Sequence, residues 1–250
     1  MRTYEFPLNE FIRTSLKIDY LHRFLDTQCE NPGEPEMRNL VSRTLELYTL
    51  IARPELKNEM IKEVEKRLKR LDNLRHIKSI NHAVLRQTTA RMSTAIQELR
   101  SVNASSFSAP LPHLIDSVKQ RLSIPGGQFD FDLPAYKYWL TADKKRFQNE
   151  IREVISSLRP ITHSAALLIE LLRGSATAQT LIAENGLYQI SENRNCDMLI
   201  IGLNDKLNLF PEISGGKHRV YLRFLEFNDI YNKPQQSMNT IEFELTCCFA

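Results

Sequence analysis

The sequence predicts an α+β protein, with an N-terminal all-helical domain over residues 8–174 followed by a C-terminal, mainly antiparallel β domain over residues 175–250. Throughout the first domain, apolar residues recur at three- and four-residue spacing, which is typical of amphipathic helices. After Gly174 the spacing changes to two, and β-branched and aromatic residues gather in short runs that are typical of strands. Residues 1–7 also contain an alternating segment, which could add a strand to the β domain.

The helical half divides into amphipathic stripes separated by breaks. The first stripe consists of Phe11, Ile12, Leu16, Tyr20, Phe24 and Leu25. Further stripes predict helices at residues 40–51, 56–71 and 85–99, and a small-residue break follows at residues 101–112. Beyond this break we expect one short helix, a loop, and a helical pair over residues 144–173 that Pro160 interrupts or kinks.

The β half contains a hairpin signal and several predicted strands. Asn185-Gly186 favours a two-residue hairpin turn, because such turns need residues that tolerate positive φ. Residues 198–203 are predicted to form a mostly buried strand, and residues 218–227 and 240–249 are predicted to form half-exposed strands.

The composition is that of an ordinary soluble globular protein, with 42% hydrophobic and 25% charged residues. The longest apolar runs fall far short of the roughly 20 residues that cross a bilayer. The amino terminus lacks the features of a signal peptide, so we expect a cytoplasmic protein without membrane insertion. The net charge of +3 is too small to require a nucleic acid as partner.

The usual motifs of catalysis and metal binding are missing from the sequence, which contains no G-x-S-x-G, H-E-x-x-H or G-x-G-x-x-G. Residues 214–218 superficially resemble a phosphate-binding loop, but Pro211 replaces its first glycine and His218 replaces its magnesium-binding residue. The six histidines contain no i, i+4 pair, and the four cysteines contain no C-x-x-C pair. We therefore expect a protein that is not an enzyme, with no metal, no cofactor and reduced cysteines.

Residues 118–140 place rare residues in a fixed order within the helical half. Pro125 fixes φ, and Gly126 and Gly127 permit positive φ, so one helix is expected to end there in a sharp turn. In the run Phe129–Asp132, two acids alternate with two phenylalanines. Paired catalytic carboxylates are one interpretation, but an extended segment that anchors both rings while its acids face water explains the pattern more simply.

The strongest candidate binding surface lies on the predicted strand at residues 217–224. The apolar residues of this strand share one face, so a basic stripe with one aromatic residue occupies the opposite face. This basic stripe consists of Lys217, Arg219, Tyr221 and Arg223. At roughly 3.3 Å per residue it spans about 20 Å, which is long enough for a short acidic peptide held by two-pronged arginine contacts.

Other interpretations of the basic residues stay open. Glu242 and Glu244 lie on the polar face of another predicted strand, and they would pair with Arg219 and Arg223 if the two strands were neighbours. The helical segment at residues 62–78 is net positive, which would suit an acidic partner, although charge runs on helices usually form a solvated face.

Several distinctive motifs accompany residues 118–140 along the chain. They are Pro7-Leu8-Asn9-Glu10 with Arg13-Thr14, Asn185–Gln189, Pro211–Gly215, and Glu242–Leu245 with Cys247-Cys248. Together these segments resemble the ZapD family of bacterial cell division proteins, whereas between residues 29 and 110 the resemblance rests on helical pattern. The resemblance implies the same division into a helical domain and a β domain.

The resemblance also implies a cell division protein that binds the acidic and apolar carboxy-terminal tail of FtsZ and bundles its filaments at mid-cell. Bridging two filaments requires two sites, so we expect a homodimer. The basic positions implied in tail binding are Lys217, Arg219 and Arg223 in the β domain, Arg13 and Lys17 in the first helix, and His113, Lys119, Arg121 and Lys137 around residues 118–140. Arg121 could instead serve the carbonyl groups at the end of its helix.

Two other classes of function are weighed against this interpretation. The alternative is a nucleic-acid-binding protein that uses the basic helix and strand surfaces, although the chain lacks a recognised nucleic-acid-binding motif. The third class is an enzyme whose site is assembled from residues distant in the sequence.

Overall fold

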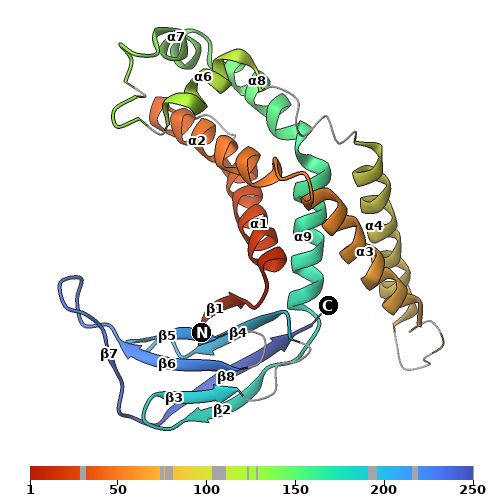
Figure 1. Ribbon diagram of the computed structural model, residues 1–250, viewed down its shortest axis with the longest axis vertical. Helices are drawn as coiled ribbons and strands as arrows, with labels where there is room; N and C mark the ends of the chain where they lie inside the picture. The colour runs from red at the N-terminus through yellow and green to blue at the C-terminus, as the bar shows by residue number, and fades with distance from the viewer. Residues whose placement is uncertain are drawn as a thin grey trace. The chain divides into compact units, whose positions relative to one another are not determined.

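The structure is a computed structural model, and it describes residues 1–28, 32–73, 76, 81–102, 111–122, 124–127, 129–190, 196–215 and 219–249. Figure 1 traces the helices and strands in chain order. The chain forms two compact units: the β unit, with Met1–Ser15 and Leu168–Ala250, and the helical unit, with Leu16–Leu167. The predicted α+β class is confirmed, because helices fill the N-terminal part and antiparallel strands fill the C-terminal part.

The helices are α1 (Glu10–Gln28), α2 (Glu34–Ile51), α3 (Leu56–Asn73), α4 (His82–Ser101), α6 (His113–Arg121), α7 (Pro134–Ala142), α8 (Lys144–Ser157) and α9 (Arg159–Arg173). The predicted stripes after the first coincide with α2, α3 and α4. Pro160 separates α8 from α9 as expected, since it lies in the first turn of α9, where a missing backbone N–H costs no helical hydrogen bond. Among the described residues, no helix has the length and apolar character needed to cross a membrane.

Two details of the helical prediction are wrong. Tyr20 is 61% exposed, because the buried face of α1 follows the helical period in a different phase. The apolar residues of that buried face are Ile12, Ile18, Leu21 and Leu25. In addition, the segment before α8 is not a loop throughout, because α7 begins at Pro134, whose fixed φ suits the first helical position.

The strands are β1 (Arg2–Pro7), β2 (Gln179–Ala183), β3 (Leu187–Ile190), β4 (Met198–Leu203), β5 (Leu209–Gly215), β6 (Val220–Glu226), β7 (Gln235–Gln236) and β8 (Ile241–Cys248). They form one sheet in the order β1-β4-β8-β2 and a second sheet in the order β3-β6-β5, with β7 paired to β6. All of these pairings are antiparallel. The N-terminal segment therefore joins the first sheet as an edge strand beside β4.

The two sheets share one hydrophobic core. Leu199 and Ile201 come from the first sheet and Leu222 comes from the second, and all three are fully buried in one cluster. The rings of Phe224 in β6 and Phe243 in β8 lie 5.0 Å apart across this core. The β unit is therefore a small sandwich in which each sheet turns its apolar side toward the other.

The turn at Asn185-Gly186 passes the chain from the first sheet to the second. Both residues have positive φ, at 51° and 65°, as a two-residue hairpin turn of this kind requires. Glu184 and Leu187 pair across the turn. A Cβ atom at Gly186 would also collide with the carbonyl oxygen of Ser237, so the position needs glycine for two separate reasons.

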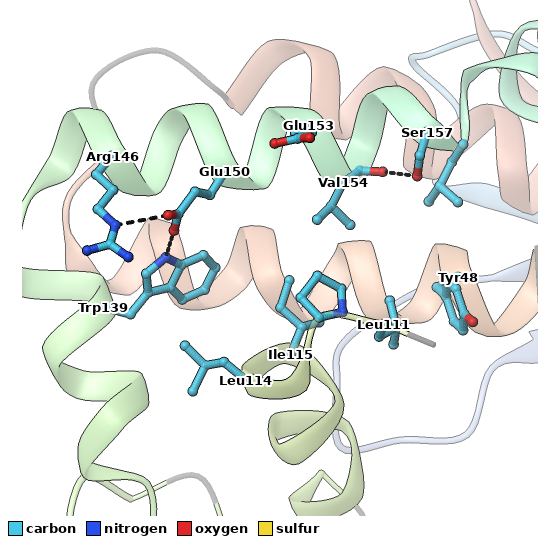
Figure 2. Close-up of a pocket in the computed structure, with 12 residues that line it drawn as sticks. Tyr48, Leu111, Leu114, Ile115, Trp139, Arg146, Glu150, Glu153, Val154 and Ser157 are labelled. Atoms are coloured by element: carbon cyan, nitrogen blue, oxygen red, sulfur yellow. Dashed lines mark hydrogen bonds and ion pairs between the residues drawn. The ribbon is translucent and has the colours of Figure 1, made fainter. Parts of the chain in front are cut away.

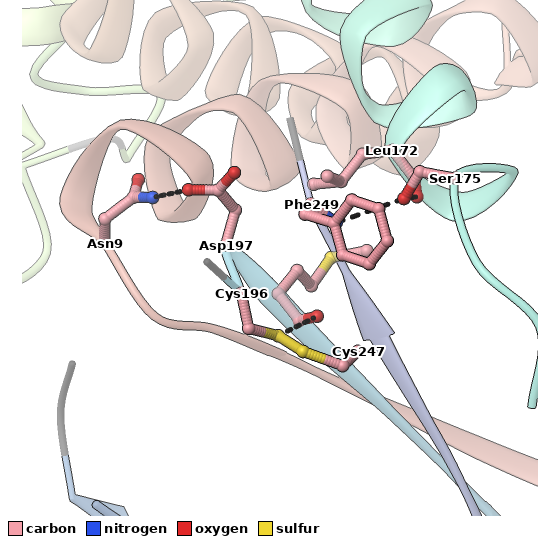
Figure 3. Close-up of a disulfide and its surroundings, with 8 residues drawn as sticks. Asn9, Leu172, Ser175, Cys196, Asp197, Cys247 and Phe249 are labelled. Carbon is pink, nitrogen blue, oxygen red and sulfur yellow. Dashed lines mark hydrogen bonds between the residues drawn. A yellow bond between two sulfur atoms is a disulfide. The ribbon is translucent and has the colours of Figure 1, made fainter. Parts of the chain in front are cut away.

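The prediction that all cysteines stay reduced is wrong for one pair. Figure 3 shows Cys196 and Cys247 joined by a disulfide, with their Cα atoms 5.6 Å apart. The two residues are 51 positions apart in the sequence, and the pairing of β4 with β8 brings them within the range that a disulfide spans. Cys248 keeps a free thiol, and burial raises the pKa of that thiol.

The residue after Cys196 ties β4 to the start of α1. The backbone carbonyl of Asp197 accepts a hydrogen bond from the Leu8 N–H at 2.9 Å. Its side chain accepts a second bond from the Asn9 amide at 3.0 Å, as Figure 3 shows. Asn9 in turn accepts the Ile12 N–H at 2.9 Å, which satisfies one free donor at the start of α1.

Candidate functional site

The basic stripe on β6 has the orientation that strand alternation predicts. Val220, Leu222 and Phe224 are fully buried in the sandwich core. The intervening residues face outward: Arg219 and Arg223 are exposed, and Tyr221 is 40% exposed. Lys217, the remaining residue of the stripe, lies outside the described residues.

The sheet topology excludes Glu242 and Glu244 as partners of the stripe. The neighbours of β6 are β3 and β5, whereas Glu242 and Glu244 belong to β8 in the other sheet. Because the apolar faces of β6 and β8 meet inside the sandwich, their polar faces point in opposite directions, and these two acids do not pair with the stripe. The residue directly opposite Arg223 is Glu212 of β5, and Arg223 Nε donates to Glu212 Oε2 at 3.0 Å.

On the outer face of the second sheet, the guanidinium group of Arg223 is ion-paired, whereas that of Arg219 has no ion pair among the described residues. Leu187 of β3 lies opposite Arg223 and is 44% exposed, so it widens the apolar surface around Tyr221. Within the described part of the chain, Arg219 forms no ion pair. The face therefore combines a free arginine, an arginine shared with one acid, and two exposed apolar side chains, which suits a peptide that is both acidic and apolar.

Arg13 and Lys17 of α1 are four residues apart, so both point to the same side of that helix. Both side chains are exposed. Arg13 Nε lies 3.5 Å from Glu10 Oε2, and its guanidinium lies 6.0 Å from the centre of the Phe6 ring. For Lys17, no acidic partner occurs among the residues that the structure describes. Arg13 belongs to the β unit and Lys17 to the helical unit.

The other predicted basic residues lie on α6 and α7 of the helical unit. Lys119 places its Nζ 5.1 Å from the centre of the Tyr48 ring. Arg121 in the last turn of α6 lies 3.7 Å from Asp132, and it also has the position that the capping alternative expects. His113 is the first residue of α6, and its carbonyl accepts the Ser117 hydroxyl at 2.9 Å.

Lys137 belongs to a charge cluster that the sequence did not reveal. Its Nζ lies 2.8 Å from Glu34 Oε2 and 3.2 Å from Asp130 Oδ2. Arg38 of α2 donates to the same two acids, with an Nη2 to Oε1 distance of 2.8 Å at Glu34. We call Glu34, Arg38, Asp130 and Lys137 the loop cluster. The i, i+4 spacing of Glu34 and Arg38 was the one signal that linked any of its members.

The loop cluster alters the proton affinity of its members. The hydrogen bonds from Lys137 and Arg38 lower the pKa of Glu34. The bond to Glu34 in turn raises the pKa of Lys137. Partial burial works to raise the pKa of Asp130, but hydrogen bonds from Arg38 and Lys137 outweigh it and leave that pKa lowered. All four groups therefore stay charged at neutral pH.

The expectation that Phe129 and Phe131 are anchored while the adjacent acids face water is wrong. The two rings are 60% and 80% exposed, and they stack on each other with centroids 5.5 Å apart. The acids between and after them make ion pairs. The reason is that the segment turns, with the Leu133 N–H bonded to the Phe129 carbonyl at 3.2 Å, so the alternation of an extended strand does not apply.

The glycines before this turn are required by the backbone. Gly126 has a φ of +73°, as the sequence predicts. Gly127 does not have positive φ, but a Cβ atom there would lie 2.5 Å from the Arg121 carbonyl oxygen. Gly127 therefore permits a close approach between the loop and the end of α6.

Comparison with known proteins identifies the family to which this architecture belongs. A family model described as ZapD, cell division protein, matches residues 16–223. The chain belongs to the ZapD family. The cell division protein ZapD of Methylococcus capsulatus (strain Bath) is 31% identical over 249 residues, which cover 98% of this chain and 97% of that protein. The cell division protein ZapD of Escherichia coli O17:K52:H18 is 29% identical over 252 residues, which cover 98% of each chain. Membership of the ZapD family gives the chain a role in cell division.

This ZapD-family chain also has a cavity of about 560 Å³ in its helical unit. Figure 2 shows apolar side chains from α2, α6, α7 and α8 around it, with a polar group at one end. There Glu150 accepts the indole N–H of Trp139 at 2.6 Å and the Nε–H of Arg146 at 2.9 Å. The hydroxyl of Ser157 donates to the Val154 carbonyl at 2.7 Å. These polar side chains bond to one another or to the backbone, and the lining also includes Tyr48 and Glu153.

The described residues include no group of three or more His, Cys, Asp or Glu side chains placed to hold a metal ion. The candidate residues are instead basic side chains, and each unit contains some of them. In the β unit they are Arg13, Arg219 and Arg223, and in the helical unit they are Lys17, Lys119, Arg121 and Lys137. Sequence reasoning missed Glu212, because residues 209–215 were not expected to form the strand beside β6, and it missed Arg38, because the contact with Asp130 joins residues 92 positions apart.

Proposed function

We propose that this ZapD-family protein binds the acidic, apolar carboxy-terminal tail of FtsZ and cross-links FtsZ filaments during assembly of the division ring. The observation that carries the proposal is the outer face of β6, where Arg219, Tyr221 and Arg223 lie exposed along one strand. Arginine guanidinium groups bind carboxylates through two parallel hydrogen bonds, and tyrosine supplies apolar contact area. An acidic and apolar tail contains both kinds of complementary group.

Within this proposal the two arginines contribute differently. Arg219 has no ion pair among the described residues, so its donors are free for the tail. Arg223 must first share or release Glu212, and both side chains of that pair are nearly half exposed, so exchange of one carboxylate for another costs little. Tail binding should therefore weaken as salt concentration rises, because exposed charge contacts are screened.

Cross-linking requires two tail sites in one particle. We propose a two-fold homodimer, because such a dimer carries two identical sites and can bridge two filaments. Each contact can be weak, since a filament displays many tails and the second attachment is effectively intramolecular. Light scattering of the pure protein tests this step, and a monomer that persists at micromolar concentration together with the tail would contradict it.

Co-sedimentation with FtsZ filaments tests the function itself. We expect the protein to pellet with filaments of full-length FtsZ and to stay in the supernatant with FtsZ that lacks its tail. A fluorescent fusion is expected at mid-cell. Equal pelleting with both forms of FtsZ would contradict the proposed tail site and leave the mode of filament contact to be found elsewhere on the protein.

Among the residues that the structure describes, the ion pairs of the basic helix give no support to the nucleic-acid alternative. On the described part of the basic helix, Lys66 lies 3.6 Å from Glu63, while Glu65 is bound by Arg100 of α4 at 2.6 Å. These two acids of α3 are thus paired with cations, as is common on a solvated helix face. Filter binding to random DNA and RNA serves as the control, and binding there at physiological salt would favour the alternative.

A further inference from the structure

The carboxylate of Asp130 lies between two cations of the helical unit, Arg38 and Lys137. We call this binding position, which the two cations form, the seat. Lys137 Nζ lies 3.2 Å from Asp130 Oδ2, and Arg38 Nη2 donates to Asp130 Oδ1. The Arg38 guanidinium also lies 5.2 Å from the centre of the buried Tyr136 ring, so its direction is held by packing. The seat is thus built on α2 and α7, whereas its occupant belongs to the loop that connects α6 to α7.

Of the two acids in the loop cluster, Asp130 is the replaceable one. Glu34 begins α2 and bonds to both Arg38 and Lys137, whereas the Asp130 side chain is 49% exposed and lies on a turn. Without Asp130, two cations and one carboxylate are left, which gives the seat one net positive charge. A carboxylate from another molecule would restore neutrality there, as Asp130 does now.

An apolar surface adjoins this seat. A groove of about 900 Å³ is lined by the charged residues Glu34, Arg38 and Asp130 together with Leu122, Ile124, Phe129 and Phe131. These four apolar side chains are all exposed, and the two phenylalanine rings stack on each other at an interplanar angle of 16°. The segment Phe129–Asp132 is itself an acidic and aromatic peptide. The chain therefore displays, in its own loop, the kind of ligand that the seat and the rings accept.

We propose that this groove is a second docking surface for an acidic, apolar peptide and that Asp130 is an internal competitor for it. A carboxylate of the incoming peptide takes the place of Asp130 on Arg38 and Lys137, and the apolar residues of the peptide lie on Phe129 and Phe131. The inference rests on the proposed function, because the peptide is of the class of the FtsZ tail. It adds that Asp130 lowers the affinity of the helical unit for the peptide.

The test compares binding of a synthetic FtsZ tail peptide to the full-length protein and to the variant Asp130→Asn, which keeps the size of the side chain and removes its charge. We expect binding to tighten about two- to fivefold, as for removal of one exposed ion pair. The matched control is Asp116→Asn, which makes the same change in net charge on α6, where Asp116 accepts a bond from Gln120 and not from a cation. Addition of Arg38→Gln to Asp130→Asn should abolish the gain.

Three outcomes would overturn the inference. They are unchanged or weaker binding by Asp130→Asn, an equal gain in the Asp116→Asn control, and a gain that persists without Arg38. A second variant guards against altered folding: Phe131→Ser changes an 80% exposed side chain and should weaken peptide binding while the melting temperature stays constant. Unchanged binding in this variant also counts against the surface. If neither the unaltered protein nor any variant binds the peptide, the proposed function fails as well, whereas binding without the Asp130 effect contradicts this inference alone.

Discussion

The basic stripe on β6 and the loop cluster both gather cations, yet they hold them in different states. On the stripe, Arg219 is free of ion pairs within the described residues and Arg223 shares one acid with the strand beside it. In the loop cluster, Arg38 and Lys137 each contact the same two carboxylates. The number of basic residues in a region therefore does not give its capacity for an acidic ligand. That capacity depends on the acids that the fold brings to them.

The largest effect should come from charge reversal on the stripe. Arg219→Glu combined with Arg223→Glu should weaken binding of the FtsZ tail by about thirtyfold or more, since loss of a close charge contact at an interface costs on the order of 2 kcal/mol. The melting temperature should fall only modestly, because both side chains are exposed, although Arg223→Glu places a like charge opposite Glu212. Isothermal titration with the tail peptide and thermal unfolding measure the two quantities.

A charge swap serves as the control for this prediction. Arg223→Glu with Glu212→Arg should restore the ion pair across β5 and β6 and leave tail binding weak. If the swap restores tail binding completely, Arg223 acts through its contact with Glu212 and not on the tail. Tail binding that survives reversal of both arginines in a folded protein would move the site to the helical unit, and the comparison between the two regions would be reversed.

The next effect concerns the glycines that shape the backbone near each region. Gly186→Ala forces positive φ on a side chain and a clash with Ser237, and Gly127→Ala forces a clash with the carbonyl of Arg121. Each should lower the free energy of unfolding by roughly 1–3 kcal/mol. Gly174→Ala is the matched control, because its Cβ atom would make ordinary contacts of 3.7 Å.

These glycine variants are read out by chemical denaturation followed in both units. The single tryptophan, Trp139, lies on α7 with its ring 4.7 Å from that of Phe147, so its fluorescence reports the helical unit. Circular dichroism reports the strands of the β unit together with the helices. We expect Gly127→Ala to shift the tryptophan transition. A Gly127→Ala protein as stable as the control would show that the loop relaxes, and that the loop cluster does not depend on its backbone.

Strand alternation explains why the stripe was predictable. In β6 the burial of Val220, Leu222 and Phe224 follows directly from the period of two, so the outward direction of Arg219, Tyr221 and Arg223 also follows. The turn at Asn185-Gly186 was predictable for a similar local reason, because it needs positive φ at two successive positions, although the strands on either side belong to different sheets. The partner acid of Arg223 was not predicted, because residues 209–215 were not expected to form the strand that pairs with β6.

The contacts of the loop cluster could not be predicted from the local spacing of residues in the sequence. The run Phe129–Asp132 alternates like a strand, but the chain turns there, so the predicted burial is inverted. The pairing of Lys137 with Glu34 joins residues 103 positions apart, and the disulfide joins residues 51 positions apart. Neither contact can be predicted from the spacing of residues near each other in the sequence. The contact of Arg38 with Asp130 is also long-range, and only its i, i+4 spacing from Glu34 was visible in the sequence.

A smaller effect should appear when the loop cluster is titrated with acid. The pKa of Glu34 lies below its ordinary value of 4.5, and that of Asp130 lies below 3.8. Acids with lowered folded-state pKa values contribute stability above their unfolded pKa values, and this stability is lost as the pH falls through the folded-state values. The free energy of unfolding reported by Trp139 should therefore decline below about pH 4.5, and Glu34→Gln should make this decline shallower. Glu36→Gln, an exposed acid in the same turn of α2, is the control, and an equal change in that variant would contradict the role of the loop cluster.

The smallest effect is expected for the ion pair between Arg223 and Glu212. Both side chains are nearly half exposed, so solvent screens their attraction, and a double-mutant cycle with alanine should give a coupling of about 0.2–1 kcal/mol in the free energy of unfolding.

The same ion pair should affect the affinity for the tail more than it affects the stability of the fold. Glu212→Gln frees the Arg223 guanidinium without reversing any charge, so tail binding should tighten while stability falls only slightly. Hydrogen exchange on β6 measures the stability, and titration with the tail peptide measures the binding. A coupling above about 2 kcal/mol would mean that Arg223 mainly stabilises the sheet. The stripe would then resemble the loop cluster, in which the cations bind acids of the protein itself.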